Sequence, residues 1–251
     1  MTGKNLILAA IFFTAVCSST VLAGPLVLSG SSTVEKLVLE PSHKALEAKT
    51  GVAIEVLGPG TIHGVKALMK GEVAAATASC PLDVVFQETG IPSEGTYQEH
   101  VIQQDTVVAI VHPGSKVKGL TLAQLADILS GKITNWKDVG GADGRIVVVA
   151  PPPSSGTRAF VRDVVMKGAE FAGNAYVTVT DREAIDLVAA SPIAIGILSE
   201  GFVRIGTGKV KVVKTPALKR QLSIITRDNP SPELKAVIAF LKSKEAKKLF
   251  R

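Results

Sequence analysis

Short apolar runs alternate with amphipathic stretches along most of the chain, from Leu26 to about Val203. Runs such as Val107–Val111 and Ile146–Ala150 have the length of strands and are rich in β-branched residues. The stretches between the runs carry apolar residues at helical spacing, as in Leu122–Leu129, where Thr121 is a candidate N-cap. This alternation predicts βαβ units and an α/β fold built on a mostly parallel sheet.

Further helices are predicted by the same spacing and by residues that begin helices. Pro41 is expected to bend the first of them, and Ser231 with Pro232 forms a helix start of the kind that proline favours. The predicted helices cover residues 34–46, residues 64–69, residues 182–190 with Asp181 as the cap, and residues 232–249.

The N-terminal segment has the organisation of a secretory signal peptide. Lys4 precedes an apolar run from Leu6 to Val16, and small residues lead up to Ala23. The run is too short to cross a bilayer as a helix. Residues 1–23 are therefore predicted to be cleaved on export, with a periplasmic location for the rest. Cys17 follows a poor lipobox, so no lipid anchor is expected.

Composition adds a few limits. Aromatic residues make up 4% of the 251 residues, so the core should consist of Val, Ile, Leu and Ala, which suits a buried parallel sheet. Cys80 is the only cysteine after residue 23, so no intrachain disulfide can form. The net charge is +6, and removing Lys4 leaves +5. This excess favours anionic partners. Basic and aromatic residues do not interleave, so no nucleic-acid partner is expected.

Three Ser/Thr/Gly turns follow apolar runs and precede amphipathic stretches: residues 29–33, 58–64 and 154–157. A strand that runs into such a turn and then a helix presents hydroxyls and unpaired N–H groups at the positive end of the helix dipole. A single turn of this kind can be an ordinary N-cap. Because the arrangement occurs three times, the sequence predicts an anion site.

These turns, with the segment Gly131-Lys132-Ile133-Thr134-Asn135-Trp136, occur in the order typical of the phosphate-binding proteins of ABC phosphate importers. The chain resembles that family over essentially its whole length after the signal peptide. The resemblance implies a type II periplasmic binding protein fold, with two α/β lobes joined by two crossing strands and a ligand cleft between them. It places lobe I in residues 24–105 and 199–251, and lobe II in residues 106–198.

The resemblance also implies ligand contacts, which fall on Ser32, Thr33, the Val34 amide, Thr61, Ser79, Ser155, Gly156 and Thr157. Pro151 and Cys80 stand where relatives carry arginines, and Ala74 stands where they carry an aspartate. Each lost charge-assisted bond is worth about 1.5–3 kcal/mol. Arg158 is a candidate for supplying the missing positive charge.

The expected function is an exported, monomeric solute-binding protein that captures phosphate or a related oxyanion and passes it to an ABC permease. The alternative is a sensory or protein-interaction module of the same fold whose degenerate pocket binds no anion tightly. No enzyme is expected, because Gly-x-Ser-x-Gly is absent and the four histidines form no catalytic pattern. No cofactor or metal is expected either, because His63 and Cys80 offer only two donors.

Overall fold

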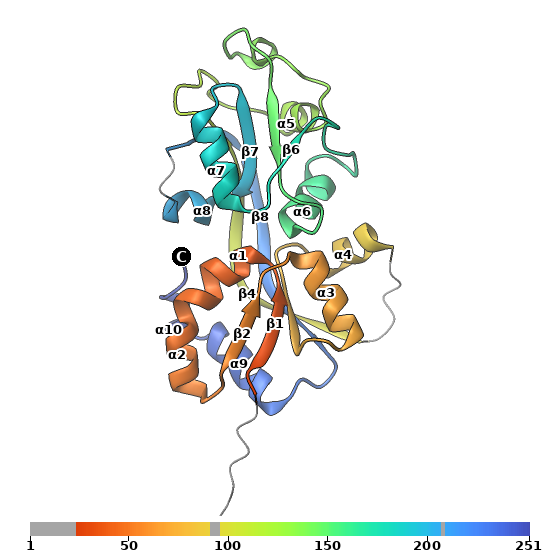
Figure 1. Ribbon diagram of the computed structural model, residues 1–251, viewed down its shortest axis with the longest axis vertical. Helices are drawn as coiled ribbons and strands as arrows, with labels where there is room; N and C mark the ends of the chain where they lie inside the picture. Colours follow the sequence, from red (N-terminus) through yellow and green to blue (C-terminus); the bar gives the residue numbers. More distant parts are fainter. Residues whose placement is uncertain (1–23, 91–95, 207–208) are drawn as a thin grey trace, which may run out of the picture.

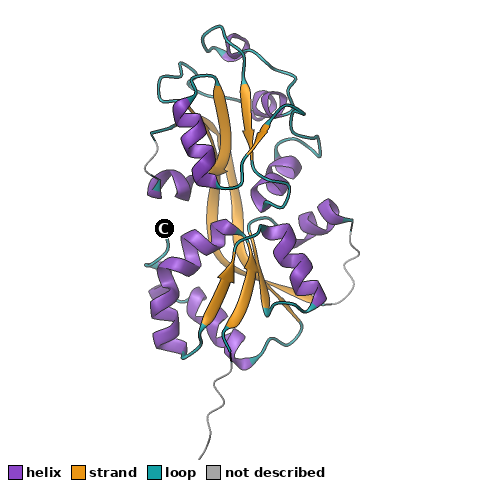
Figure 2. Ribbon diagram, in the orientation of Figure 1, coloured by secondary structure: helices purple, strands orange, loops and turns teal. Residues whose placement is uncertain are grey.

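Two α/β lobes lie one above the other along the long axis of the molecule (Figure 1). The computed structural model describes residues 24–90, 96–206 and 209–251. The predicted signal peptide and Cys17 lie outside these residues. Helices cover both faces of the strands in each lobe, as Figure 2 shows. This arrangement confirms the predicted α/β architecture.

One sheet runs through both lobes. Its strand order is β2-β1-β3-β8-β4-β7-β5-β6. The two long strands β4 (Tyr97–Val111) and β8 (Lys211–Arg227) are antiparallel partners over nearly their full length, from Tyr97↔Arg227 to Val111↔Lys211. They join the lobes, so the hinge of the molecule consists of two hydrogen-bonded strands.

Lobe I, the lower half of Figure 1, has three parallel strands on one side of the crossing pair. The strands are β1 (Leu26–Gly30), β2 (Ile54–Leu57) and β3 (Ala75–Ala78). The helices are α1 (Ser32–Val34), a π-helical turn (Glu35–Leu39), α2 (Glu40–Thr50), α3 (Thr61–Lys70), α4 (Leu82–Thr89), α9 (Pro232–Lys242) and α10 (Lys244–Lys247).

Lobe II has three parallel strands on the other side of the crossing pair. The strands are β5 (Val147–Ala150), β6 (Tyr176–Val177) and β7 (Ala194–Ser199). The helices are α5 (Leu122–Leu129), a 3₁₀ turn (Trp136–Val139), α6 (Gly156–Val164), α7 (Asp181–Ala190) and α8 (Glu200–Ile205).

Helix α8 belongs to lobe II, although the sequence assigned everything after residue 198 to lobe I. Phe202 of α8 packs in one apolar cluster with Val108 and Ile185 of lobe II. Ser199 caps α8 by accepting a hydrogen bond from the Gly201 amide at 3.2 Å, so the polar Ser199-Glu200 pair starts a helix. The chain returns to lobe I only along β8.

Several helix ends differ from the predicted ones by a few residues. Thr180, rather than Asp181, caps α7 and accepts from the Glu183 amide. The last predicted helix is interrupted at Ser243, which caps α10 after α9 has ended. Thr121 forms the expected N-cap with a full capping box. Among the helices that the structure describes, none combines the length and the apolar character needed to cross a membrane.

Candidate functional site

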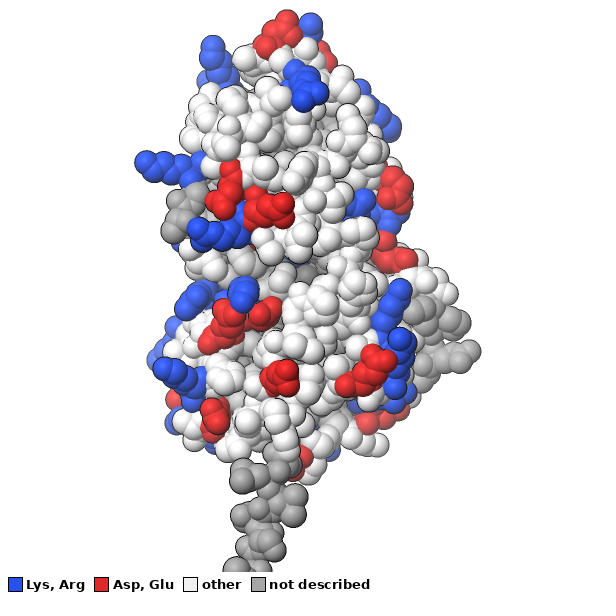
Figure 3. Space-filling view, in the orientation of Figure 1, with Lys and Arg blue, Asp and Glu red and all other residues white. Residues whose placement is uncertain are grey.

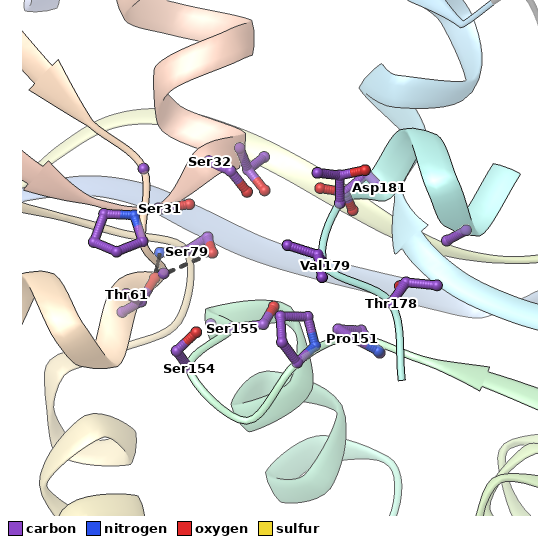
Figure 4. A pocket seen from close by; sticks show the side chains of 18 of the residues that line it. Ser31, Ser32, Thr61, Ser79, Pro151, Ser154, Ser155, Thr178, Val179 and Asp181 are labelled. Carbon is purple, nitrogen blue, oxygen red and sulfur yellow. Dashed lines mark hydrogen bonds between the residues drawn. The ribbon is translucent and has the colours of Figure 1, made fainter. Parts of the chain in front are cut away.

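A polar cavity of about 40 Å³ lies between the lobes, where the N-termini of α1, α3, α6 and α7 converge (Figure 4). Lobe I lines it with Ser31, Ser32, Thr33, Gly58, Pro59, Gly60, Thr61 and Ser79. Lobe II lines it with Pro151, Pro152, Ser154, Ser155, Gly156, Thr178, Val179, Thr180, Asp181, Ala184 and Ile197.

The first Ser-rich turn reaches the cavity directly from β1. Gly30 has φ +145°, and a Cβ there would lie 2.1 Å from the Thr77 carbonyl oxygen, so this tight turn requires glycine. Ser31 then acts as the N-cap, its Oγ accepting from the Val34 amide at 3.3 Å. Ser32, the next residue, does not cap the helix, and its side chain faces the cavity.

The second turn leads from β2 into α3. Gly60 has φ +108°, and Thr61 begins the helix with its side chain fully buried. Thr61 Oγ1 accepts a hydrogen bond from the Ser79 amide at 3.2 Å and lies 3.4 Å from Ser79 Oγ, as drawn in Figure 4. The end of β3 and the start of α3 therefore hold each other in place at the cavity wall.

The third turn leads from β5 into α6 in lobe II. Ser155 is the N-cap, and its Oγ accepts from the amides of Thr157 at 3.1 Å and Arg158 at 3.4 Å. Gly156 is the first helical residue and faces Thr61 and Ser79 across the cleft. The positive end of the α6 dipole therefore points at the hydroxyls of lobe I.

Most of the ligand contacts implied by the sequence lie around this cavity. It brings together Ser32, Thr33, Thr61, Ser79, Ser155 and Gly156, which come from both lobes. The Val34 amide instead donates to its own N-cap, Ser31. Thr157 is not among the residues that line the cavity, and its hydroxyl accepts a hydrogen bond from Arg220.

The guanidinium of Arg158, the candidate for the missing positive charge, contacts residues of its own lobe. It donates to the Pro151 carbonyl at 3.0 Å and lies over the ring of Phe171, 4.5 Å from the ring centre. Burial lowers the pKa of this guanidinium. The side chain therefore braces α6 against its own lobe, and the sequence-based expectation that it compensates for Pro151 and Cys80 finds no support in this geometry.

A different arginine, Arg220 of β8, lies beneath the cavity. Its side chain is fully buried and pairs with Asp105 of β4, with Nε 2.8 Å from Oδ2. Nη1 donates to Thr157 Oγ1 at 2.7 Å and to the Ser79 carbonyl at 3.0 Å. Arg220 is therefore a cation in contact with residues of the site. The sequence pattern had not predicted Arg220 as a site residue.

Asp181 is the one carboxylate among the described residues that line the cavity. It is the first residue of α7, and its side chain faces Ser32 across the cleft (Figure 4). Burial raises the pKa of this carboxyl to about 6, although the nearby Arg220 acts in the opposite direction. A carboxylate at this point can accept a hydrogen bond from a ligand but cannot donate one unless it is protonated.

His63 and Cys80 lie in different surroundings. Cys80 is buried, and burial raises the pKa of its thiol to about 12, so it stays neutral. His63 is exposed, and its Nδ1 lies 3.2 Å from the Pro59 carbonyl oxygen. Within the described part of the chain, no group of three or more His, Cys, Asp or Glu side chains could hold a metal ion.

The lobes touch each other directly beside the cavity. The Ile62 amide of lobe I donates to the Ser154 carbonyl of lobe II at 3.1 Å. Glu88 of α4 and Arg162 of α6 form an ion pair between partly buried side chains. The structure is thus a closed arrangement in which the cavity has polar walls from both lobes.

The fold and the site define the class of protein. A family model described as a PBP superfamily domain matches residues 18–245, and the chain belongs to that superfamily. The chain is also similar to the phosphate-binding protein PstS of Bacillus subtilis, with 32% identity over 183 residues. That match covers 72% of this chain and 59% of the Bacillus protein, so the chain spans less than two thirds of this relative.

Two solved structures resemble the molecule along nearly its whole length. A Clostridium perfringens protein described as a putative phosphate ABC transporter substrate-binding protein, with bound phosphate, is 28% identical with a TM-score of 0.78. The match covers 90% of this chain and 96% of that one. An ABC-type phosphate transport receptor from Vibrio cholerae is 28% identical with a TM-score of 0.72, covering 89% and 96%.

Proposed function

We propose that this chain is an exported solute-binding protein that captures inorganic phosphate between its lobes and delivers it to an ABC permease. The observation that carries the proposal is the convergence of hydroxyls and helix N-termini from both lobes on one small cavity. A dehydrated tetrahedral oxyanion needs many hydrogen-bond donors at fixed positions. Because the donors come from both lobes, bound phosphate would stabilise the closed arrangement.

The charges around the cavity favour phosphate over sulfate. Arg220 is a buried cation beneath the cavity, but its charge is balanced by Asp105. Asp181 supplies an acceptor in a cavity otherwise rich in donors. Phosphate near neutral pH still carries a proton that it can donate to this carboxylate, whereas sulfate carries none and would meet uncompensated negative charge.

The wider setting is inferred from the relatives and the sequence. Relatives with the same fold are described as parts of phosphate ABC transporters, which supports a permease as the partner. The predicted signal peptide supports a periplasmic location. Acidic and basic side chains are interspersed over both lobes on the face drawn in Figure 3, without a continuous basic patch. We propose that the protein is a monomer and that it needs no cofactor or metal.

Thermal unfolding tests the proposal. Protein lacking residues 1–23 is refolded to remove carried ligand and is then unfolded in phosphate, arsenate, sulfate, molybdate, citrate or buffer alone. Phosphate at a thousand times its Kd adds about 4 kcal/mol to the free energy of unfolding. This corresponds to a rise in Tm of roughly 8–16 °C for a chain of this size.

The result separates the proposal from its alternatives. A rise with phosphate but not with sulfate supports phosphate capture. A rise with another anion alone keeps the fold and changes the substrate. If no anion raises Tm, the hypothesis of a degenerate pocket in a sensory or interaction module replaces the proposal.

A further inference from the structure

The guanidinium of Arg220 is bonded to groups from both lobes at once. Nη1 donates to Thr157 Oγ1 of lobe II at 2.7 Å and to the Ser79 carbonyl of lobe I at 3.0 Å. Nη2 lies 3.5 Å from Thr33 Oγ1, also in lobe I. The Arg220 side chain is fully buried and does not line the cavity. Arg220 therefore acts on the cavity through the residues to which it is bonded.

Asp105 of β4 fixes the position of Arg220 in the hinge. Asp105 is its direct cross-strand partner in the β4–β8 pair. The second oxygen of that carboxylate accepts from Ser199 Oγ at 2.7 Å, and Ser199 caps α8. Asp105 therefore both balances the charge of Arg220 and aims its donors at the cleft.

The two hydroxyls bonded to Arg220 are constrained in direction by the chemistry of their partner. A guanidinium only donates hydrogen bonds, so each hydroxyl bonded to it must use its oxygen as the acceptor. Each hydroxyl has a single proton, and that proton is then left to donate elsewhere. Among the described residues, no group accepts the hydroxyl proton of Thr33 or of Thr157. Thr33 lines the cavity, and Thr157 follows Gly156, which lines it too.

We propose that Arg220 is a positioning residue, which orients the hydroxyls of Thr33 and Thr157 as donors to a bound oxyanion and does so only when the lobes are closed. This inference rests on the proposed function. Because the arginine sits between the lobes, opening the cleft must break its bond either to Thr157 or to Ser79 and Thr33. Closure and the correct direction of the hydroxyls thus arise together.

A double-mutant cycle on phosphate binding tests the proposal. Thr157→Val removes one oriented donor, and Arg220→Lys keeps the positive charge beside Asp105 but loses the planar fork that reaches Thr157. Each change alone is expected to weaken phosphate binding about tenfold. The two together are expected to weaken it about tenfold as well, because the second change removes nothing that the first has left. Thr157→Ser, which keeps the hydroxyl, is expected to bind like the wild type.

Thr178 provides the matched control for the cycle. Thr178 lines the cavity, but its hydroxyl donates to the Ala150 carbonyl at 3.4 Å and is not bonded to Arg220. Thr178→Val and Arg220→Lys should therefore act independently. If Arg220→Lys lowers the yield of folded protein, the cycle is repeated with Arg220→Gln combined with Asp105→Asn, which removes both buried charges together.

The possible results separate the inference from the proposed function. Wild-type protein that binds no phosphate overturns both. Wild-type binding with a loss of about a hundredfold in the Thr157/Arg220 double variant means independent effects and overturns the positioning role alone. Unchanged affinity in Arg220→Lys also overturns it, because a charge without the fork would then suffice. The positioning role is supported if the Thr157/Arg220 double variant loses only about tenfold in phosphate affinity and the effects of Thr178→Val and Arg220→Lys are additive.

Discussion

Gly156 of lobe II faces Thr61 of lobe I so closely that no side chain fits between them. A Cβ at position 156 would lie 2.5 Å from Thr61 Oγ1 and 2.6 Å from Ser79 Oγ. These two hydroxyls belong to the opposite cavity wall. Glycine at this position is thus a condition for the closed arrangement.

Gly156→Ala is therefore expected to hold the lobes apart and to weaken phosphate binding by about a hundredfold or more, while each lobe stays folded. The nearest atoms that the added methyl group meets all belong to Thr61 and Ser79 of the other lobe. Isothermal titration gives the affinity, and small-angle scattering gives the separation of the lobes. Gly173→Ala is the control, because a Cβ there meets nothing within 4 Å. Wild-type affinity in Gly156→Ala would mean that phosphate binds without this closure.

Ser31 and Ser32 are adjacent, but they are expected to respond differently to alanine. Ser32→Ala should weaken phosphate binding about tenfold and leave Tm unchanged, because the Ser32 hydroxyl lines the cavity and makes no hydrogen bond to another described residue. Ser31→Ala should lower the free energy of unfolding by about 1 kcal/mol, because Ser31 caps α1. Titration and thermal unfolding of both variants check this, and equal loss of stability in both would contradict it.

The turns that build the cavity could be predicted from the sequence, because each one joins a strand to a helix within a few residues. Thr61 and Ser155 also make hydrogen bonds within the protein that a local sequence pattern does not reveal. Thr61 accepts from the Ser79 amide, eighteen positions along the chain, and Ser155 caps α6. Removing either hydroxyl would therefore cost stability as well as affinity, contrary to the expectation for a side chain that only binds ligand.

Arg220 and Asp181 could not be assigned to the site from the sequence, for physical reasons. Arg220 stands between Lys219 and Gln221, well inside the segment assigned to lobe I, and its partner Asp105 is 115 positions away. A signal existed nonetheless, because Leu218, Arg220 and Leu222 alternate on the buried face of β8. An arginine at an inward position of such a pattern needs a buried partner. Asp181 was assigned to capping, a role that Thr180 fills.

The ion pair between Glu88 and Arg162 is expected to help hold the lobes closed. Partly buried pairs of this kind contribute on the order of 1 kcal/mol, so Glu88→Gln should weaken phosphate binding about two- to fivefold at low salt. The difference from the wild type should shrink as salt rises. Titrations at two salt concentrations measure both effects.

Glu170→Gln is the matched control for this pair. Glu170 also contacts Arg162, at 2.6 Å, but both residues belong to lobe II. Its removal should leave the affinity unchanged. An equal loss in both variants would mean that Arg162 acts within its own lobe and not as a link between the lobes.

Asp181→Asn is expected to reduce the preference for phosphate over sulfate. The amide removes the negative charge that opposes a fully ionised ligand, so sulfate binding should strengthen roughly 10- to 100-fold near neutral pH. Competition titrations with the two anions measure the preference. Asp186→Asn, on the exposed face of the same helix, should leave the preference unchanged. If sulfate binds no better to Asp181→Asn than to the wild type, Asp181 does not select the ligand.

The raised pKa of Asp181 also predicts how the ligand-free protein responds to pH. Burial raises this pKa from 3.8 to about 6 in the folded state, so between these values the folded chain holds a proton that the unfolded chain has lost. The free energy of unfolding should therefore fall as pH rises from about 4 to 6, by up to about 3 kcal/mol, and this contribution should then stay constant.

Urea unfolding at about pH 4.5 and about pH 7 tests this, with the wild type compared with Asp181→Asn so that all other titrating groups cancel. The wild type should lose stability relative to the variant as pH rises, because asparagine has no proton to release. Phosphate is removed beforehand, since bound ligand would add its own pH dependence. The same pH dependence in both proteins would mean that the Asp181 carboxylate stays solvated in the closed cleft and that burial does not raise its pKa.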